Sequence, residues 1–238
     1  MTCRERLKRV FMCREVDRMP VRIDALDPLS PRYRKDWDEL YLLTEKYELE
    51  ILRDWIPLKE EMPALPYNLF SEEKSSALSG MKEITTFIES PDGKMTEIYN
   101  YPEDGSPGYI KKHFIEDVND AKKYLSLPEQ ANFPAIESYL DIERKTGGRA
   151  MLMIGIDEAA YAVQRLMGSE LFGYWLYDER DLLRQLVDRA YREIEKLTKH
   201  YLSKISATAW VGSAPKFASL LSLLSKTLTS SSLSMTKN

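Results

Sequence analysis

The feature that most constrains the fold is an uninterrupted apolar segment in the second half of the chain, residues 150–156 (AMLMIGI). A run of this length without polar alternation is typical of a parallel strand that is covered on both faces. Residues 136–142 carry apolar side chains on one helical face, and Gly147 and Gly148 end that helix before the strand begins. The sequence therefore predicts an α/β protein with this strand in its interior.

Helices are predicted downstream of the strand. The first covers residues 157–166, and a second restarts at Gly168 and runs to Trp175. The clearest helix of the chain covers residues 183–201, where apolar side chains recur at intervals of three and four. This region is predicted to be helical throughout.

The pattern of residues in the N-terminal quarter of the chain predicts a helix, a strand and a second helix. Thr2 and Glu5 form a capping box for the opening helix. Residues 21–24 are short and alternating, which predicts a first strand, and residues 37–55 carry apolar side chains at helical spacing, which predicts one long helix. Residues 57–79 are proline-rich and give no clear pattern.

An antiparallel insert is predicted in the middle of the chain. Residues 84–89 and 95–101 are strand-like and flank Pro91-Asp92-Gly93, and an Asp-Gly pair between such runs is a strong hairpin signal. A further strand is predicted over residues 109–115, followed by a helix through residues 118–125.

Composition excludes several partner classes. A net charge of -4 with interspersed lysines and arginines gives no basic surface for nucleic acid. No apolar run is long enough to span a bilayer, so we expect no membrane partner and a cytoplasmic location. Cys3 and Cys13 lie at the edge of one short helix, which favours reduced thiols over a disulfide framework.

Three blocks of this sequence resemble the uroporphyrinogen decarboxylase family, which includes corrinoid-dependent methyltransferases. The first is residues 2–6 (TCRER) with 17–21 (DRMPV), and the second is residues 109–121 (YIKKHFIEDVNDA). The third runs from residues 154–170, ending LMGSE, to residues 177–183 (YDERDLL). The blocks occur in the family's order.

The resemblance implies a (β/α)8 TIM barrel with an active site at the carboxyl ends of its strands. Members of the family are longer than this chain, so residues 1–205 would form the N-terminal part of a barrel that is incomplete at the C-terminus, with the antiparallel hairpin as an insert. A barrel that lacks strands has free sheet edges.

The tail, residues 206–238, differs from the rest of the chain. All 38 acidic residues lie at or before Glu195, and the tail is rich in serine and leucine. Codons permitted for residues 225–238, read from the third base, can encode a string that resembles the family's next helix. We favour a frameshift near the Leu-Ser repeats, and the alternative is a genuine Ser-rich disordered tail.

The resemblance leaves the chemistry open between two branches. The methyltransferase branch implies a zinc ion, held by histidine and cysteine, that activates a thiol, and a corrinoid as methyl carrier or corrinoid-protein substrate. His113, His200 and the two cysteines do not form such a cluster in the sequence, so no metal site or cofactor is assigned to this chain. The zinc ligands would lie beyond it.

Decarboxylation of uroporphyrinogen in porphyrin biosynthesis is the second branch. Its arginine-rich N-terminal loop is replaced here by a loop with Arg32 and Arg34, which are the candidates for binding an anionic substrate. The family's tyrosine four residues before the glycine matched by Gly168 is Gln164 here, and Tyr161 is displaced by one helical turn. We favour the methyltransferase branch for the intact parent.

Asp24 and Asp157 are the remaining catalytic candidates, together with Gln164. Each aspartate follows a predicted strand, where barrel enzymes place functional groups. The alternative for Asp157 and its neighbour Glu158 is an N-cap of the next helix. A non-catalytic remnant or binding protein is a third interpretation of the whole chain, and its oligomeric state is not predicted.

Overall fold

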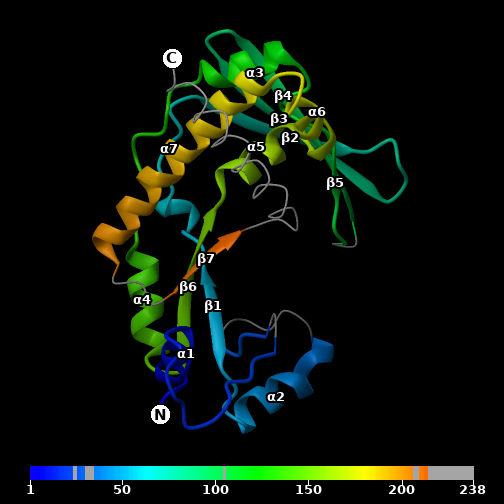
Figure 1. The fold of residues 1–238 in the computed structure, drawn as a ribbon. Coiled ribbons are helices and arrows are strands. Elements are labelled where there is room, and N and C mark those ends of the chain that lie inside the picture. The colour runs from blue at the N-terminus through cyan, green and yellow to red at the C-terminus, as the bar shows by residue number, and fades with distance from the viewer. Residues whose placement is uncertain (24–25, 30–34, 104–105, 206–208, 214–238) are drawn as a thin grey trace, which may run out of the picture. The chain divides into compact units, whose positions relative to one another are not determined.

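A computed structural model of the chain describes residues 1–23, 26–29, 35–103, 106–205 and 209–213. These residues divide into two compact units (Figure 1). The parallel-sheet unit comprises Met1–Pro63, Phe133–Ile156 and Thr198–Gly212, and the antiparallel-sheet unit comprises Ala64–Asn132 and Asp157–Leu197.

The parallel-sheet unit is built on three strands: β1 (Ile51–Trp55), β6 (Ala150–Asp157) and β7 (Ala209–Ser213), in the order β1-β6-β7 (Figure 1). β1 and β6 pair in parallel from Ile51 opposite Ala150 to Trp55 opposite Ile154. The first five residues of β6 are buried, which confirms the predicted central strand.

Among the described residues, this unit contains three whole α-helices, two short 3₁₀ turns and the end of α7 (Arg180–Lys204) from Thr198 onward. The whole helices and turns are α1 (Cys3–Phe11), η1 (Lys35–Trp37), α2 (Asp38–Lys46), η2 (Lys59–Glu61) and α4 (Glu137–Thr146). The capping box of Thr2 and Glu5 is formed at α1, and Gly147 ends α4 with a φ of 53°. The ring of Trp55 packs edge-on against Tyr139 of α4 at a centroid distance of 5.5 Å. This contact joins β1 to α4.

The long helix predicted over residues 37–55 is wrong in its second half. α2 ends at Lys46, because Glu48 takes a left-handed conformation with a φ of 48°, and β1 follows. The apolar residues of 51–55 serve a strand, which helical spacing alone did not distinguish. The strand predicted over residues 21–24 is not formed at its described residues, 21–23. The backbone carbonyl of Val21 accepts a hydrogen bond from Glu50 N at 2.9 Å, but no ladder of such bonds follows there.

The antiparallel-sheet unit contains a four-stranded sheet in sequence order. Its strands are β2 (Asn68–Ser75), β3 (Met81–Ser90), β4 (Gly93–Pro102) and β5 (Tyr109–Lys112). The hairpin predicted around Asp92 is confirmed, since Ser90 pairs with Gly93, whose φ of 125° suits glycine. β2 was not predicted from the proline-rich segment that contains it.

Helices complete the core of this unit. They are α3 (Val118–Leu125), α5 (Ala159–Met167), α6 (Ser169–Trp175) and α7 (Arg180–Lys204), the last through Leu197. Ile88 and Met95 of the sheet share one buried cluster with side chains from all four helices, such as Val163 and Leu186. Burial of these apolar side chains, which are far apart in the sequence, is the main contribution to the stability of this unit.

The architecture is mixed α/β, with a parallel sheet and an antiparallel sheet, and no closed barrel is formed within the described residues. No helix in the described ranges combines the length and apolar character needed to cross a membrane. The tail interpretation concerns residues 206–238, of which only 209–213 are described, as β7.

Candidate functional site

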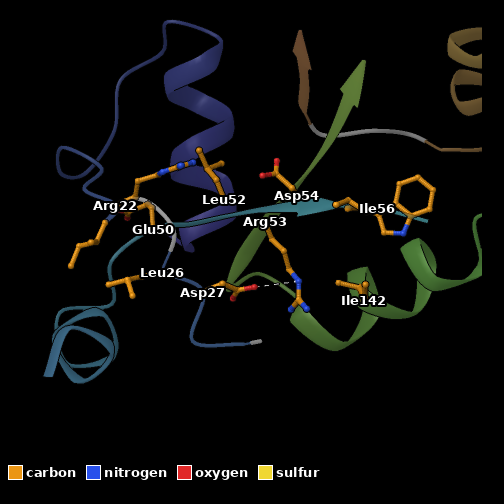
Figure 2. A pocket seen from close by; sticks show the side chains of 11 residues that line it. Arg22, Leu26, Asp27, Glu50, Leu52, Arg53, Asp54, Ile56 and Ile142 are labelled. Carbon is orange, nitrogen blue, oxygen red and sulfur yellow. Dashed lines mark ion pairs between the residues drawn. The ribbon is translucent and has the colours of Figure 1, made fainter. Parts of the chain in front are cut away.

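A pocket of about 520 Å³ lies beside β1 in the parallel-sheet unit (Figure 2). Its walls come from β1 with the residues on either side, from residues 22–23 and 26–27, and from α4. The lining side chains are Arg22, Ile23, Leu26, Asp27, Glu50, Leu52, Arg53, Asp54, Trp55, Ile56 and Ile142. Charged and apolar groups are mixed, as in sites that bind small polar molecules.

The position of β1 at the edge of its sheet explains the pocket. β6 is the one strand that pairs with β1 among the described residues, so the other edge of β1 is left to the pocket, which residues 22–23 and 26–27 also line. Side chains alternate along a strand. Figure 2 accordingly shows Leu52 and Asp54 on one side of β1 and Arg53 on the other.

Arg53 ties the loop after residue 23 to the strand. Its Nε lies 3.3 Å from Oδ2 of Asp27, and both side chains are 20% exposed. Nη1 of Arg53 also donates to the carbonyl of Leu29 at 3.3 Å. Leu26, 6% exposed, anchors the loop by its apolar side chain. The guanidinium is therefore held at the pocket with part of its surface accessible to a ligand (Figure 2).

Glu50 closes one end of the pocket as a fully buried anion. Its carboxylate accepts from Arg6 Nη1 at 2.5 Å and from the backbone N of Val21 at 2.7 Å, and Arg18 Nη2 lies at 2.9 Å. Two guanidinium groups and an amide thus compensate the charge, as burial requires. With its oxygens occupied in this way, Glu50 serves as an anchor for β1 rather than as a proton acceptor.

Asp17 completes this ion network. Arg6 donates to both of its oxygens, from Nε at 2.6 Å and from Nη2 at 2.9 Å. Hydrogen bonding from Arg6 is the largest cause that lowers the pKa of Asp17. Desolvation opposes it, and the positive charge of Arg6 adds to the lowering. The hydrogen bond with Asp17 in turn raises the pKa of Arg6. The two shifts favour the ionised forms of Asp17 and Arg6.

Of the site residues predicted from sequence, only Asp157 and Gln164 belong to the described residues. Asp24, Arg32 and Arg34 lie outside the described residues. Asp157 ends β6 with an exposed side chain, and Gln164 of α5 donates from Nε2 to Ser169 Oγ at 3.0 Å. Asp157 and Gln164 do not line the pocket beside β1.

The alternative role of Asp157 and Glu158 as a helix cap is answered in part. Glu158 occupies the N-cap position of α5, but its side chain makes no capping hydrogen bond. The side chain of Glu158 therefore does not cap α5.

The described residues do not fit a zinc site. Among them, no three His, Cys, Asp or Glu side chains are grouped as metal ligands. The thiol of Cys3 is buried 3.1 Å from Nη1 of Arg149, and Cys13 is exposed. His113 and His200 each bond through a ring nitrogen to a backbone carbonyl, at 3.1 Å and 2.8 Å.

Sequence reasoning missed Arg53, Asp54 and Asp27. The assignment of residues 37–55 to one helix gave Arg53 and Asp54 no role in a site. A signal was present, because two adjacent charges stand between Leu52 and Trp55 in a run that is otherwise apolar. Edge strands often carry charged side chains, so such a pair is compatible with an edge strand.

Comparisons with known proteins add no name to this geometry. No protein-family model, no curated protein and no solved structure matches the chain.

Proposed function

We propose that the chain is part of a uroporphyrinogen decarboxylase family protein whose intact parent has a (β/α)8 barrel and resembles the corrinoid-dependent methyltransferases. The parallel order β1-β6-β7, in which chain order and spatial order agree, supports this proposal. Successive parallel strands joined by helices are the repeating element of such a barrel. The parent would transfer a methyl group between a corrinoid and a thiol or related acceptor.

The observation that carries the proposal is the pocket at the open edge of β1. Its walls include Trp55 and Ile56 at the carboxyl end of β1, and a barrel of this type binds its substrate at the carboxyl ends of its strands. A volume of about 520 Å³ lies within the range of small-molecule sites, about 300–1,000 Å³. The pocket suits a small acceptor, and Arg53 favours an anionic one.

Decarboxylation of a porphyrinogen is the second candidate function. The observation in its favour is that two arginines, Arg22 and Arg53, line the pocket, since guanidinium groups pair well with carboxylates. The third interpretation, a non-catalytic remnant or binding protein, assigns the pocket no reaction.

Binding experiments on the purified chain distinguish these functions. Mercaptopropionate, an anionic thiol, is titrated by calorimetry, and uroporphyrin is titrated by fluorescence quenching. Arg53→Ala is compared with Arg180→Ala, which removes an exposed arginine of α7 in the other unit. Thiol binding that Arg53→Ala alone weakens supports the leading proposal, and uroporphyrin binding with the same dependence supports the second. Binding of neither probe overturns both.

Resequencing the gene tests whether the chain is part of a longer protein. We expect a one-base correction within the codons for residues 206–238 to open a frame that encodes further βα units with His and Cys residues. That frame would allow methyl transfer and decarboxylation to be assayed directly on its product. A frame that ends as given contradicts the frameshift.

A further inference from the structure

A second hollow, of about 520 Å³, lies on the outer side of α1, opposite the buried residues Cys3, Arg6 and Leu7. It shares no lining residue with the pocket beside β1. Its lining consists of Met1, Glu5, Lys8, Arg9, Met12 and Arg14. Three of these six side chains are basic, although the whole chain has a net charge of -4. The hollow is therefore a local positive site on an acidic protein.

The two arginines on the inner side of α1, Arg4 and Arg6, both form ion pairs. Arg6 is buried against Asp17 and Glu50, and Arg4 Nη2 lies 2.6 Å from Oε1 of Glu143 on α4. These ion pairs, with the capping box at Thr2, hold α1 in place. The outer side is thus presented on a fixed support, so binding would incur little ordering entropy.

The basic groups of the outer side lack such partners. Within the described residues, no carboxylate forms an ion pair with Lys8 or Arg14, and both side chains are exposed. Arg9 donates to the backbone carbonyl of Glu15 at 2.9 Å. The one acidic group of the hollow, Glu5, is engaged by the backbone N of Thr2 at 2.9 Å. The hollow therefore has an excess of positive charge for an anionic ligand.

Apolar groups accompany the charge. Met1 is 48% exposed and Met12 is 53% exposed, and the neighbouring Phe11 is 59% exposed. Methionine side chains adapt to the shape of an inserted apolar group, which makes them common at peptide-binding surfaces. A free inorganic anion would leave this apolar surface in water, whereas an amphipathic ligand covers it.

We propose that the hollow on the outer side of α1 is a docking site for an acidic peptide segment of another protein, with an apolar side chain that packs on Met1 and Met12. The carboxylates of the segment pair with Lys8, Arg9 and Arg14. A membrane surface fits less well, because α1 has nine residues and its other face, with Cys3 and Leu7, is buried. This proposal is independent of the function assigned to the pocket beside β1.

The test uses fluorescence anisotropy with a fluorescein-labelled peptide of Asp and Glu residues around a central Leu-Phe pair. We expect binding that weakens as salt rises, since exposed ion pairs are screened. The double variant Lys8→Glu/Arg14→Glu should bind about tenfold more weakly, because two rim charges are reversed. Met12→Ala should also weaken binding, and so should a peptide with glycines in place of Leu-Phe.

The matched control is Arg180→Glu/Arg184→Glu, which makes the same change in net charge at exposed positions of α7. It should bind the peptide as the unaltered chain does, and circular dichroism should show the same fold for all variants. Equal binding by the Lys8→Glu/Arg14→Glu variant overturns the proposal. Stronger binding to vesicles of phosphatidylglycerol than to the peptide, or competition by inorganic phosphate alone, also overturns it.

Discussion

Strands β6 and β1 are hydrogen-bonded neighbours that use their side chains in opposite ways. Every residue of β6 from Ala150 to Ile154 is buried. In β1, Ile51 and Trp55 are buried, Arg53 is half-buried and Asp54 is exposed. The difference follows from position in the sheet, because β6 has a strand on each side and β1 has one among the described residues.

The comparison shows where a parallel sheet can place polar chemistry. A central strand must present apolar groups to both faces, so a charge there would be buried without compensation. An edge strand can direct a charge beyond the core, as β1 does with Arg53 and Asp54 at the pocket. The open edge therefore serves as the wall of a site, provided that the strand is anchored at its ends.

The largest expected effect is loss of the anchor at the start of β1. Glu50→Ala removes a buried carboxylate and leaves Arg6, with a 6% exposed side chain, short of one anion. Breaking a buried pair from one side costs about 3–5 kcal/mol. Urea unfolding followed by tryptophan fluorescence measures the loss. Asp141→Ala, which removes the partner of the exposed Lys145, is the control and should cause a much smaller loss, because solvent screens this pair. A small loss for Glu50→Ala would mean that β1 is not anchored through this network.

The next effect contrasts the two strands directly. Leu152→Ala in β6 removes a side chain that is 1% exposed and should cost about 3 kcal/mol through lost burial and a cavity. Leu52→Ala in β1 removes a half-buried side chain at the pocket and should cost about 1 kcal/mol or less. Equal losses in urea unfolding would contradict the division between a core strand and a site strand.

The same contrast explains what the sequence could predict. The unbroken apolar run of β6, the Asp92-Gly93 hairpin and the capping box of α1 are local patterns with one structural meaning each, and all three predictions are confirmed. β1 was assigned to a helix, because an edge strand with charges at 53 and 54 lacks both the alternation and the uniform apolar character that mark strands. β2 was missed for a related reason. All of its residues are exposed, so its sequence has no alternation of buried and exposed positions.

The candidate site was less predictable than the fold. The pocket depends on a pairing between Arg53 and Asp27, which are far apart in the sequence and carry no motif. Asp157 was chosen because it follows a predicted strand and Gln164 because of the resemblance, and neither lines the pocket. Asp24, Arg32 and Arg34 lie outside the described residues. Local patterns specify elements, whereas a site depends on which elements meet.

A third effect concerns the segment that follows β1. The carboxylate of Glu61 accepts from the backbone N of Ser138 at 2.6 Å and from its hydroxyl at 2.5 Å, and Trp55 Nε1 donates to the same hydroxyl. Desolvation raises the pKa of Glu61, but the hydrogen bonds from Ser138 and Leu58 outweigh it, and the pKa is lowered overall. Its stabilising contribution is therefore present above the unfolded pKa and is lost as pH falls through the folded one.

Glu61→Gln should cost about 1 kcal/mol at neutral pH, comparable to the loss of a helix cap, and less in acid. Urea unfolding of both proteins at pH values from about 7 down to about 3 measures this, since an unperturbed glutamate titrates near 4.3. If the loss of unfolding free energy in Glu61→Gln stays constant with pH, the negative charge of Glu61 does not contribute to the contact.

The smallest effect on stability is expected for Arg53→Ala, and it tests the comparison most closely. Its ion pair with Asp27 is partly exposed, with 20% of each side chain accessible, so solvent screening limits the contribution to about 0.5–1 kcal/mol. The loop that Arg53 holds through Asp27 and Leu29 should nevertheless be cleaved faster in limited proteolysis. Arg53→Lys keeps the positive charge but loses the planar guanidinium, so the rate of cleavage should rise less than in Arg53→Ala. A loss of stability as large as that of Leu152→Ala would place Arg53 in the core and remove the physical basis for a site at this edge.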